Sequence, residues 1–317
     1  MNQRLLPQGG RIAIVSPSGA IAPELMTGGV QALADAGYDV RLMPHAQGFK
    51  EGVFAAPDLM RAADLAEALL DPDVDLVWCS RGGYGAMRTL QSMTPYGGWR
   101  KVLAQTDKLI VGFSDITAIH AASTFCWHAG LHGPMLKHLA QHGLAAPDVR
   151  ATLALLKGEE VTVQRSAMEG SRDGWAEGRL IGGNLSIVYS LAAAGLMSAP
   201  DGAILFIEDL AEYRYHIDRM MQALRFSGFL ERLGGIIVGR MTGMKDGATP
   251  FGSDAYHIVA DAVADYDYPV FIGFPAGHAD DENFPLVIGG RCLLSVSQGL
   301  GTVRQAIETL DHRQRPY

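Results

Sequence analysis

A serine stands between a strand and a helix that the sequence predicts. Residues 109–113 (LIVGF) form an apolar strand pattern, residues 116–127 form a helical one, and Ser114 lies between them. A hydroxyl on such a turn is exposed, and the N–H groups of the following helix can stabilise negative charge, which suits a nucleophile. The second glycine of a G-x-S-x-G elbow is missing, however, and a serine before a helix is commonly an N-cap. These residues alone leave both interpretations open.

A glycine-rich loop follows another predicted strand, at 76–79. It has the sequence SRGGYG over residues 80–85. Glycines let a ligand approach the backbone, and amides in such a loop could stabilise an anion or an oxyanion. The glycine spacing differs from G-x-G-x-x-G, and the loop follows the third strand rather than the first. We therefore expect no nicotinamide cofactor.

Two adjacent carboxylates and one histidine follow strands in the second half of the chain. Glu208 and Asp209 end one predicted strand, and His278 follows another in a loop with the sequence GHADDE. Either carboxylate could orient the histidine, which could be a general base or could hold a metal with its acidic neighbours. Helix capping or a solvated turn explains the carboxylates equally well, and a lone loop histidine is more often simply exposed. The other histidines do not cluster with cysteines and H-E-x-x-H is absent, so we expect no metal site.

Together these residues supply a nucleophile, a base, an orienting carboxylate and an amide-rich loop. Those are the parts of a serine hydrolase, in the chain order Ser114, Glu208, His278. This order is neither that of trypsin nor that of subtilisin, but α/β-hydrolases share it. The alternative is a non-catalytic α/β ligand-binding protein in which Ser114 is only a helix cap.

The elements around these residues predict two domains. Apolar strands alternate with helices in residues 1–157, a pattern typical of an open, parallel α/β domain covered on both faces. Residues 158–177 are polar and glycine-rich, which predicts a linker. Residues 178–317 hold more strands and predict a mixed α+β domain with a small β-rich, barrel-like sheet. Within it, the glycines before Arg291 predict a hairpin between strands at 285–288 and 292–296.

Composition excludes several classes of protein. Of 317 residues, 48% are hydrophobic and 19% charged, which is typical of a cored globular protein. The net charge of −8, with no block of lysine or arginine, argues against nucleic acid as a partner. Three scattered cysteines suggest reduced thiols, and the most apolar stretch, residues 185–197, is too short to span a bilayer. With no secretory signal evident, we expect a cytoplasmic protein that does not bind membranes.

The motifs also resemble those of a known family, the LD-carboxypeptidases (muramoyltetrapeptide carboxypeptidases) of the serine peptidases. The segments that carry the resemblance run in order over nearly the whole chain: VSPSG at 15–19, RGGYG at 81–85, GFSDIT at 112–117, GPM at 133–135, GGNL at 182–185, LFIED at 205–209, and GF and GH at 273–274 and 277–278. The resemblance implies two domains, with the serine in the first and the acid and histidine in the second.

By the same resemblance, the nucleophile is Ser114, the acid is Glu208 and the base is His278. The oxyanion-hole amides would be those of Asp115 and, in the glycine loop, Gly83. No cofactor is implied. A second carboxylate, that of Glu212, follows the proposed acid by four residues, but it lacks the position at the end of a strand.

The resemblance further implies the substrate. The bond cut would join the diaminopimelate-type residue to the terminal D-Ala of a murein tetrapeptide during cell-wall recycling, and the enzyme would be a homodimer. Arg81 and Asn184 are our candidates for contacting the terminal carboxylate, although a salt bridge for the first and an N-cap for the second are at least as good an explanation. A microcin C-like peptidyl-nucleotide toxin is the alternative substrate within the same family.

Overall fold

The computed structural model describes residues 3–47 and 52–307, which fold into two compact units. The N-terminal unit contains the chain up to Glu160 and also the later segment Phe284–Gly289. The C-terminal unit holds Val161–Asn283 and Gly290–Ala306. No helix among the described residues is both long and apolar enough to cross a membrane.

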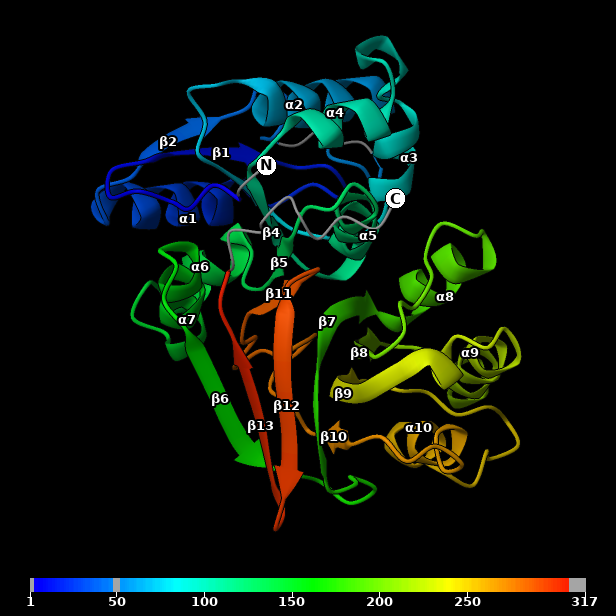
Figure 1. The fold of residues 1–317 in the computed structure, drawn as a ribbon. Helices are drawn as coiled ribbons and strands as arrows, with labels where there is room; N and C mark the ends of the chain where they lie inside the picture. The colour runs from blue at the N-terminus through cyan, green and yellow to red at the C-terminus, as the bar shows by residue number, and fades with distance from the viewer. Residues whose placement is uncertain (1–2, 48–51, 308–317) are drawn as a thin grey trace. The chain divides into compact units, whose positions relative to one another are not determined.

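The N-terminal unit is built on a six-stranded sheet (Figure 1). Its strands, in the order in which they pair, are β11 (Leu286–Ile288), β5 (Gly130–His132), β4 (Leu109–Gly112), β3 (Leu76–Cys79), β1 (Arg11–Val15) and β2 (Asp39–Leu42). All neighbours pair in parallel except β11, which runs antiparallel to β5. The predicted parallel α/β domain is therefore confirmed, with one antiparallel strand added at its edge.

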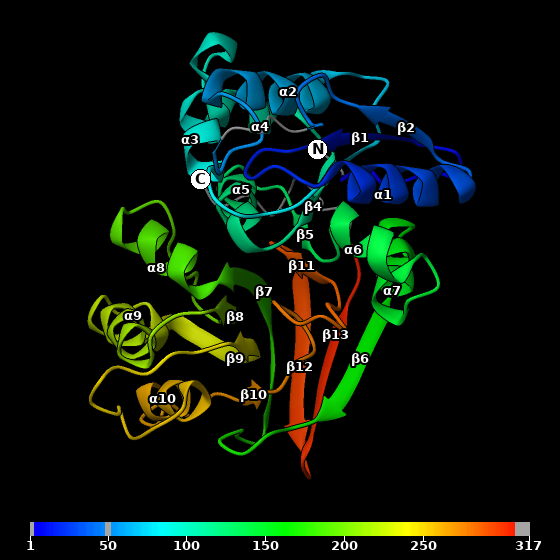
Figure 2. The ribbon, with the colours of Figure 1, turned by 180° about the vertical axis from the view of Figure 1, so that it is seen from behind.

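Helices cover both faces of this sheet. They are α1 (Pro23–Asp35), α2 (Asp58–Leu70), α3 (Ala86–Gln91), α4 (Trp99–Gln105), α5 (Thr117–Phe125), α6 (Leu136–His142) and α7 (Pro147–Leu156). Helices α1 and α6 pack side by side on the face opposite α2 and α4 (Figures 1 and 2). The close contact between α1 and α6 depends on Gly29 of α1, because a β-carbon there would lie 2.4 Å from Cγ of Leu136 on α6.

The strand order places the motif loops of this unit together. The chain builds outward from β1 in both directions, to β2 on one side and to β3, β4 and β5 on the other. Loops diverge at such a reversal of strand order, and ligands in open α/β sheets bind there, beyond the carboxyl ends of the strands. The segment 16–19 follows β1, the glycine loop 80–85 follows β3, and Ser114 follows β4.

The C-terminal unit is built on a seven-stranded sheet that is half parallel and half antiparallel. Its strands, in pairing order, are β10 (Val270–Ile272), β9 (Leu233–Thr242), β8 (Ala203–Leu210), β7 (Gly174–Asn184), β12 (Arg291–Ser297), β13 (Leu300–Gln305) and β6 (Val161–Ser166). The first four strands are parallel and the last four, which share β7 with them, are antiparallel. Helices α8 (Leu185–Ala193), α9 (Arg214–Phe226) and α10 (Ala255–Ala262) lie along the parallel half (Figure 1).

This sheet curls into the barrel-like form that we expected. The segment after β6 returns to the opposite edge strand, where the amide N of Met168 donates to the carbonyl O of Ile272 at 2.9 Å. The ring of Phe271, on β10, reaches across the interior so closely that a β-carbon on Gly301 of β13 would lie 2.2 Å from it. The ring of Phe271 therefore occupies part of the interior between the two edges of the sheet.

Two details of the predicted organisation differ from the structure. The stretch 158–177 contains β6 and the start of β7, and the boundary between the units follows Glu160. Its polar residues are those of strands with one face toward solvent, because every second residue of β6 is exposed and the residues between them are buried or half-buried. The hairpin predicted before Arg291 is wrong: β11 pairs with β5, whereas β12 pairs with β7 and β13.

Candidate active site

Ser114 occupies a strained turn between β4 and a short 3-10 helix, Ser114–Ile116. Its φ is +63°, in the left-handed region that residues with a β-carbon rarely adopt. The N-cap position of α5 is Ile116 rather than the serine, and no side chain in the part of the chain that the structure describes caps that helix. The strain of Ser114 is therefore unexplained by helix capping, and strained residues of this kind gather at functional sites.

The glycine loop approaches this serine directly. A β-carbon on Gly82 would lie 2.9 Å from Cβ and 3.1 Å from Oγ of Ser114, so only glycine leaves the hydroxyl in place. The next residue, Gly83, has φ +111°, which also favours glycine. The loop thus brings its backbone beside the serine side chain, as an amide-lined anion site requires.

The side chain of Asp115 fixes these loops to one another. Its Oδ2 accepts hydrogen bonds from Oγ of Ser18, at 2.6 Å, and from the amide N of Ala86, at 2.7 Å. Asp115 is 4% exposed, and this burial raises the pKa of its carboxyl group. One carboxyl group therefore ties the loop after β1 and the start of α3 to the turn that carries Ser114.

A buried arginine that the sequence analysis did not single out supports the same loops. The guanidinium of Arg61 donates to the carbonyl O of Gly85 at 3.0 Å, to that of Pro17 at 2.6 Å and to Oγ1 of Thr89 at 2.7 Å. Only 1% of this residue is exposed, and Asp58 is its ion-pair partner. Nothing local in a helix with the sequence DLMRAADLAEALL indicates that its arginine points inward, so this role needed the structure.

Arg81 lies at the surface beside the glycine loop. Its Nη1 donates to the carbonyl O of Ala20 at 2.9 Å, and the residue is exposed. The backbone next to it is tied down, because the amide N of Gly19 donates to the carbonyl O of Gly82 at 3.1 Å. The guanidinium of Arg81 is therefore held at the surface by the carbonyl of Ala20, beside a backbone segment that is itself hydrogen-bonded.

In the C-terminal unit, the predicted acid and base are in contact. Oε2 of Glu208 lies 2.7 Å from Nδ1 of His278. The carboxylate is fully buried, at the end of β8, whereas 17% of the histidine side chain is exposed. Gly277 permits this contact, since a β-carbon at that position would lie 2.7 Å from Oε2 of the glutamate.

The other carboxylate of the pair has a different set of partners. Oδ1 of Asp209 accepts from Nδ2 of Asn184 at 2.8 Å, and Oδ2 accepts from the amide N of Ser186 at 2.9 Å. Burial, and secondarily the charge of Glu208, raises the pKa of Asp209 to about 6. Asp209 therefore holds the start of α8 and does not contact the histidine.

Asn184 joins the two carboxylates. It is the N-cap of α8, where its Oδ1 accepts from the amide N of Ile187, so the capping interpretation is confirmed. Its Nδ2 also approaches Oε1 of Glu208, at 3.5 Å. Both ends of this side chain are thus engaged within the unit, and its amide supports the acid.

Glu212, the competing acid, is directed elsewhere. Its Oε2 lies 3.0 Å from Nδ1 of His216, one turn along the chain on α9. In the C-terminal unit, the carboxylate within hydrogen-bonding distance of His278 is that of Glu208.

Family models match both halves of the chain. The LD-carboxypeptidase N-terminal domain matches residues 12–133, and the LD-carboxypeptidase C-terminal domain matches residues 177–294. These matches cover more than half of the chain. The chain belongs to the LD-carboxypeptidase family. Ser114 falls within the first of the two family domains, and Glu208 and His278 fall within the second.

Relatives of this LD-carboxypeptidase chain support the assignment. The murein tetrapeptide carboxypeptidase of Pseudomonas aeruginosa is 31% identical over 87% of this chain and 91% of that protein. The crystal structure of the muramoyltetrapeptide carboxypeptidase from Oxalobacter formigenes matches with a TM-score of 0.82 and 28% identity, over 93% of this chain and 98% of that one. The microcin C7 self-immunity protein MccF of Escherichia coli is 25% identical over 69% of this chain and 70% of that protein. Peptidase activity therefore follows from the family, and the individual substrate does not.

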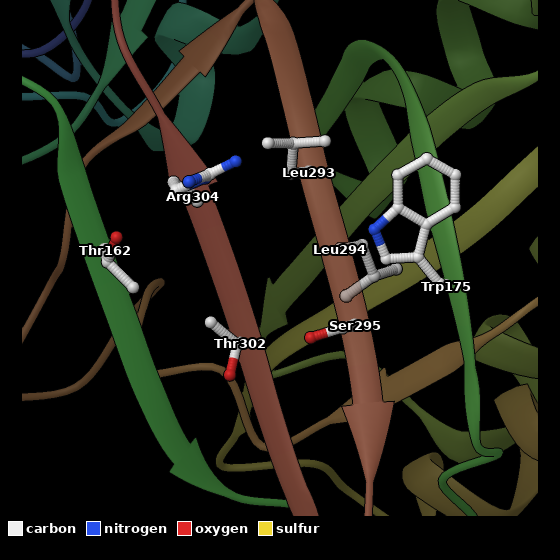
Figure 3. Close-up of a pocket in the computed structure, with 7 residues that line it drawn as sticks. All are labelled: Thr162, Trp175, Leu293, Leu294, Ser295, Thr302 and Arg304. Atoms are coloured by element: carbon white, nitrogen blue, oxygen red, sulfur yellow. The ribbon is translucent and has the colours of Figure 1, made fainter.

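A separate pocket of about 360 Å³ opens on the antiparallel half of the second sheet (Figure 3). None of its lining residues is a predicted site residue: they are Thr162, Trp175, Leu293, Leu294, Ser295, Thr302 and Arg304. Among the described residues, no group of three or more His, Cys, Asp or Glu side chains could hold a metal ion.

Proposed function

We propose that this LD-carboxypeptidase uses Ser114, His278 and Glu208 as a catalytic triad. The observation that carries the proposal is the 2.7 Å contact between the buried carboxylate of Glu208 and Nδ1 of His278. A carboxylate can only accept, so Nδ1 donates and Nε2 becomes the basic nitrogen. The strained turn at Ser114 supports the nucleophile, because no capping role explains it.

The proposed reaction begins with acyl transfer. Nε2 of His278 takes the proton from Oγ of Ser114 as Oγ attacks the carbonyl carbon of the scissile peptide bond. The imidazolium formed is stabilised by Glu208, and it then protonates the leaving amine. Water, activated by the same histidine, hydrolyses the acyl-enzyme and restores the serine.

The attack converts the carbonyl oxygen of the scissile bond into an oxyanion, and we assign its stabilisation to two backbone amides of the N-terminal unit. These are the N–H groups of Gly83, in the loop beside the serine, and of Asp115, the residue after it. The close approach of Gly82 to Ser114 supports this assignment, and so does the anchoring of the Asp115 side chain. Preorganised donors of this type lower the barrier by roughly 3–4 kcal/mol each.

As substrate we propose a murein tetrapeptide, cut between its diaminopimelate-type residue and the terminal D-Ala. The support is the similarity of the chain to the murein tetrapeptide carboxypeptidase of Pseudomonas aeruginosa and the muramoyltetrapeptide carboxypeptidase of Oxalobacter formigenes. Arg81, at the surface beside the glycine loop, remains a candidate substrate contact, whereas the side chain of Asn184 caps α8 and supports the acid, so that any contact it makes with substrate is secondary to that role. We further propose that the enzyme acts in the cytoplasm in cell-wall recycling, as a homodimer, which light scattering on the purified protein would test.

The second candidate substrate is a microcin C-like peptidyl-nucleotide. The relationship to MccF favours it, at 25% identity, and the same triad chemistry would apply. A panel that contains murein tetrapeptide, murein pentapeptide and an aminoacyl sulfamoyl nucleoside separates the two. We expect D-Ala release from the tetrapeptide with the highest kcat/KM. Cleavage of the nucleoside compound alone would overturn the murein assignment and leave the triad assignment standing.

A further inference from the structure

The pairing of β8 with β9 is irregular near the proposed acid. Ile207 pairs with Val238, and the next regular pair is Asp209 with Met241. One residue of β8 therefore faces two residues of β9 between these pairs. This is the two-against-one arrangement of a β-bulge, a feature that redirects side chains and is frequent beside active sites.

The residue of β8 at the bulge is Glu208, and the two residues of β9 are Gly239 and Arg240. Val238 and Met241, on either side of them, both belong to the apolar core cluster that the helices cover. Strict alternation along a strand cannot place positions 238 and 241 on one face, so the bulge absorbs the extra residue. Gly239 lies on the face of the acid, because a β-carbon there would stand 3.2 Å from Cβ of Glu208. The bulge puts Arg240 on that same face.

Arg240 also contacts the segment that carries the histidine. Its amide N donates to the carbonyl O of Ala276 at 2.8 Å, two residues before His278. Its Nη2 lies 4.0 Å from Oδ2 of Asp281, at the limit of an ion pair, and 71% of that aspartate side chain is exposed. Its Nε is buried and has no hydrogen-bond partner among the residues that the structure describes. However, 35% of the arginine side chain is exposed, so the accessible end of the guanidinium can meet a planar acceptor.

We propose that Arg240 binds the terminal carboxylate of the substrate and so determines that the enzyme is a carboxypeptidase. This inference rests on the proposed function, in which His278 protonates the leaving nitrogen. In a terminal residue the carboxylate carbon is two bonds from that nitrogen, through Cα. The group that binds the carboxylate must therefore lie beside the histidine. Arg240 is held against the histidine's own segment, and a guanidinium matches a carboxylate with two parallel hydrogen bonds.

The alternative role is purely structural, as a clamp on the loop that holds Asp281. The two roles predict different effects on a peptide acid and on its C-terminal amide. A carboxylate receptor distinguishes a peptide acid from the corresponding C-terminal amide, because the amide leaves buried donors poorly paired. A loop clamp affects both peptides equally, and its effect is reproduced when Asp281 is changed.

The test measures kcat and KM for murein tetrapeptide and its C-terminal amide with four proteins: wild type, Arg240→Met, Asp281→Asn and Arg232→Met. The last is the matched control, since Arg232, before β9, forms its ion pair within the described part of the chain with the exposed Asp201. We expect Arg240→Met to lower kcat/KM for the acid by roughly 100-fold, mainly through KM, and that for the amide by less than about twofold. The two other variants should remain close to wild type for both peptides.

An equal loss for acid and amide in Arg240→Met, or the same loss in Asp281→Asn, would overturn the proposal. If wild type cleaves neither peptide, the proposed function fails, and calorimetric titration of the intact protein still tests Arg240. In that experiment the acid should bind wild type more tightly than the amide, and Arg240→Met should abolish the difference. Equal binding of acid and amide to wild type would overturn the inference independently of catalysis.

Discussion

Gly82 and Ser114 are in such close contact that a β-carbon on the glycine would lie 2.9 Å from that of the serine. The two residues follow different strands, β3 and β4, which are neighbours in the parallel sheet. The glycine loop and the strained serine turn are therefore one structural unit, and a change in either should move the other.

Gly82→Ala tests this contact. Its φ lies outside the left-handed region, so the substitution introduces a side-chain clash without backbone strain. We expect it to lower kcat/KM by roughly 10-fold or more and to destabilise the fold by about 1–3 kcal/mol, the range for overpacked sites. Gly247→Ala is the control, because a β-carbon there has only ordinary contacts. Equal activity of the two variants would show that the position of the serine does not depend on the loop.

Glu208→Gln and Glu212→Gln compare the two candidate acids. A glutamine at 208 can donate to Nδ1 of His278 and so favours the wrong tautomer, which should lower kcat by roughly 10³-fold or more. Glu212 pairs with His216, and its substitution should change kcat by less than about threefold. A larger defect in Glu212→Gln would reassign the acid.

Asp209 should make the fold more stable in acid than at neutral pH. Because its pKa is raised from 3.8 to about 6, the folded state binds its proton more tightly than the unfolded state does. Its stabilising contribution is therefore complete below pH 3.8 and is lost as the pH rises through 6, by about 3 kcal/mol in all. Urea unfolding measured from pH 4 to pH 7 should show that the free energy of unfolding of wild type falls relative to that of Asp209→Asn. A difference between the two proteins that does not change with pH would contradict the prediction.

Ser114→Gly should show that the serine is retained at a cost in stability. Glycine adopts φ +63° without the penalty of a β-carbon, so this variant should unfold with about 1 kcal/mol more free energy than Ser114→Ala. Denaturant melts of the two variants measure the difference. Equal stabilities would mean that the turn is not strained.

Local patterns were sufficient to predict much of the fold. The strand at Leu76–Cys79 has the predicted bounds, because a short apolar run is a property of neighbouring residues. The error at β6 has the opposite cause. The exposed polar residues of β6 belong to a strand that pairs with β13, which lies more than a hundred residues away in the sequence.

The candidate site divides in the same way. Ser114, Glu208 and His278 could be proposed because each lies near the end of a strand or follows one, and each matches a family motif. Arg240 could not, since the bulge that redirects it depends on the register of β8 against β9, which no local pattern specifies. The position of the histidine supports the choice of Glu208 over Glu212, which the sequence had based on the end of a strand and the family motif.

The most direct test of the catalytic assignment is D-Ala release from murein tetrapeptide by Ser114→Ala, measured beside wild type. The variant should fold with a free energy of unfolding within about 0.5 kcal/mol of wild type, because it removes one hydroxyl and keeps the same backbone. We expect its rate of D-Ala release to fall by at least about 10³-fold. Release at the wild-type rate would contradict the assignment of Ser114 as the nucleophile.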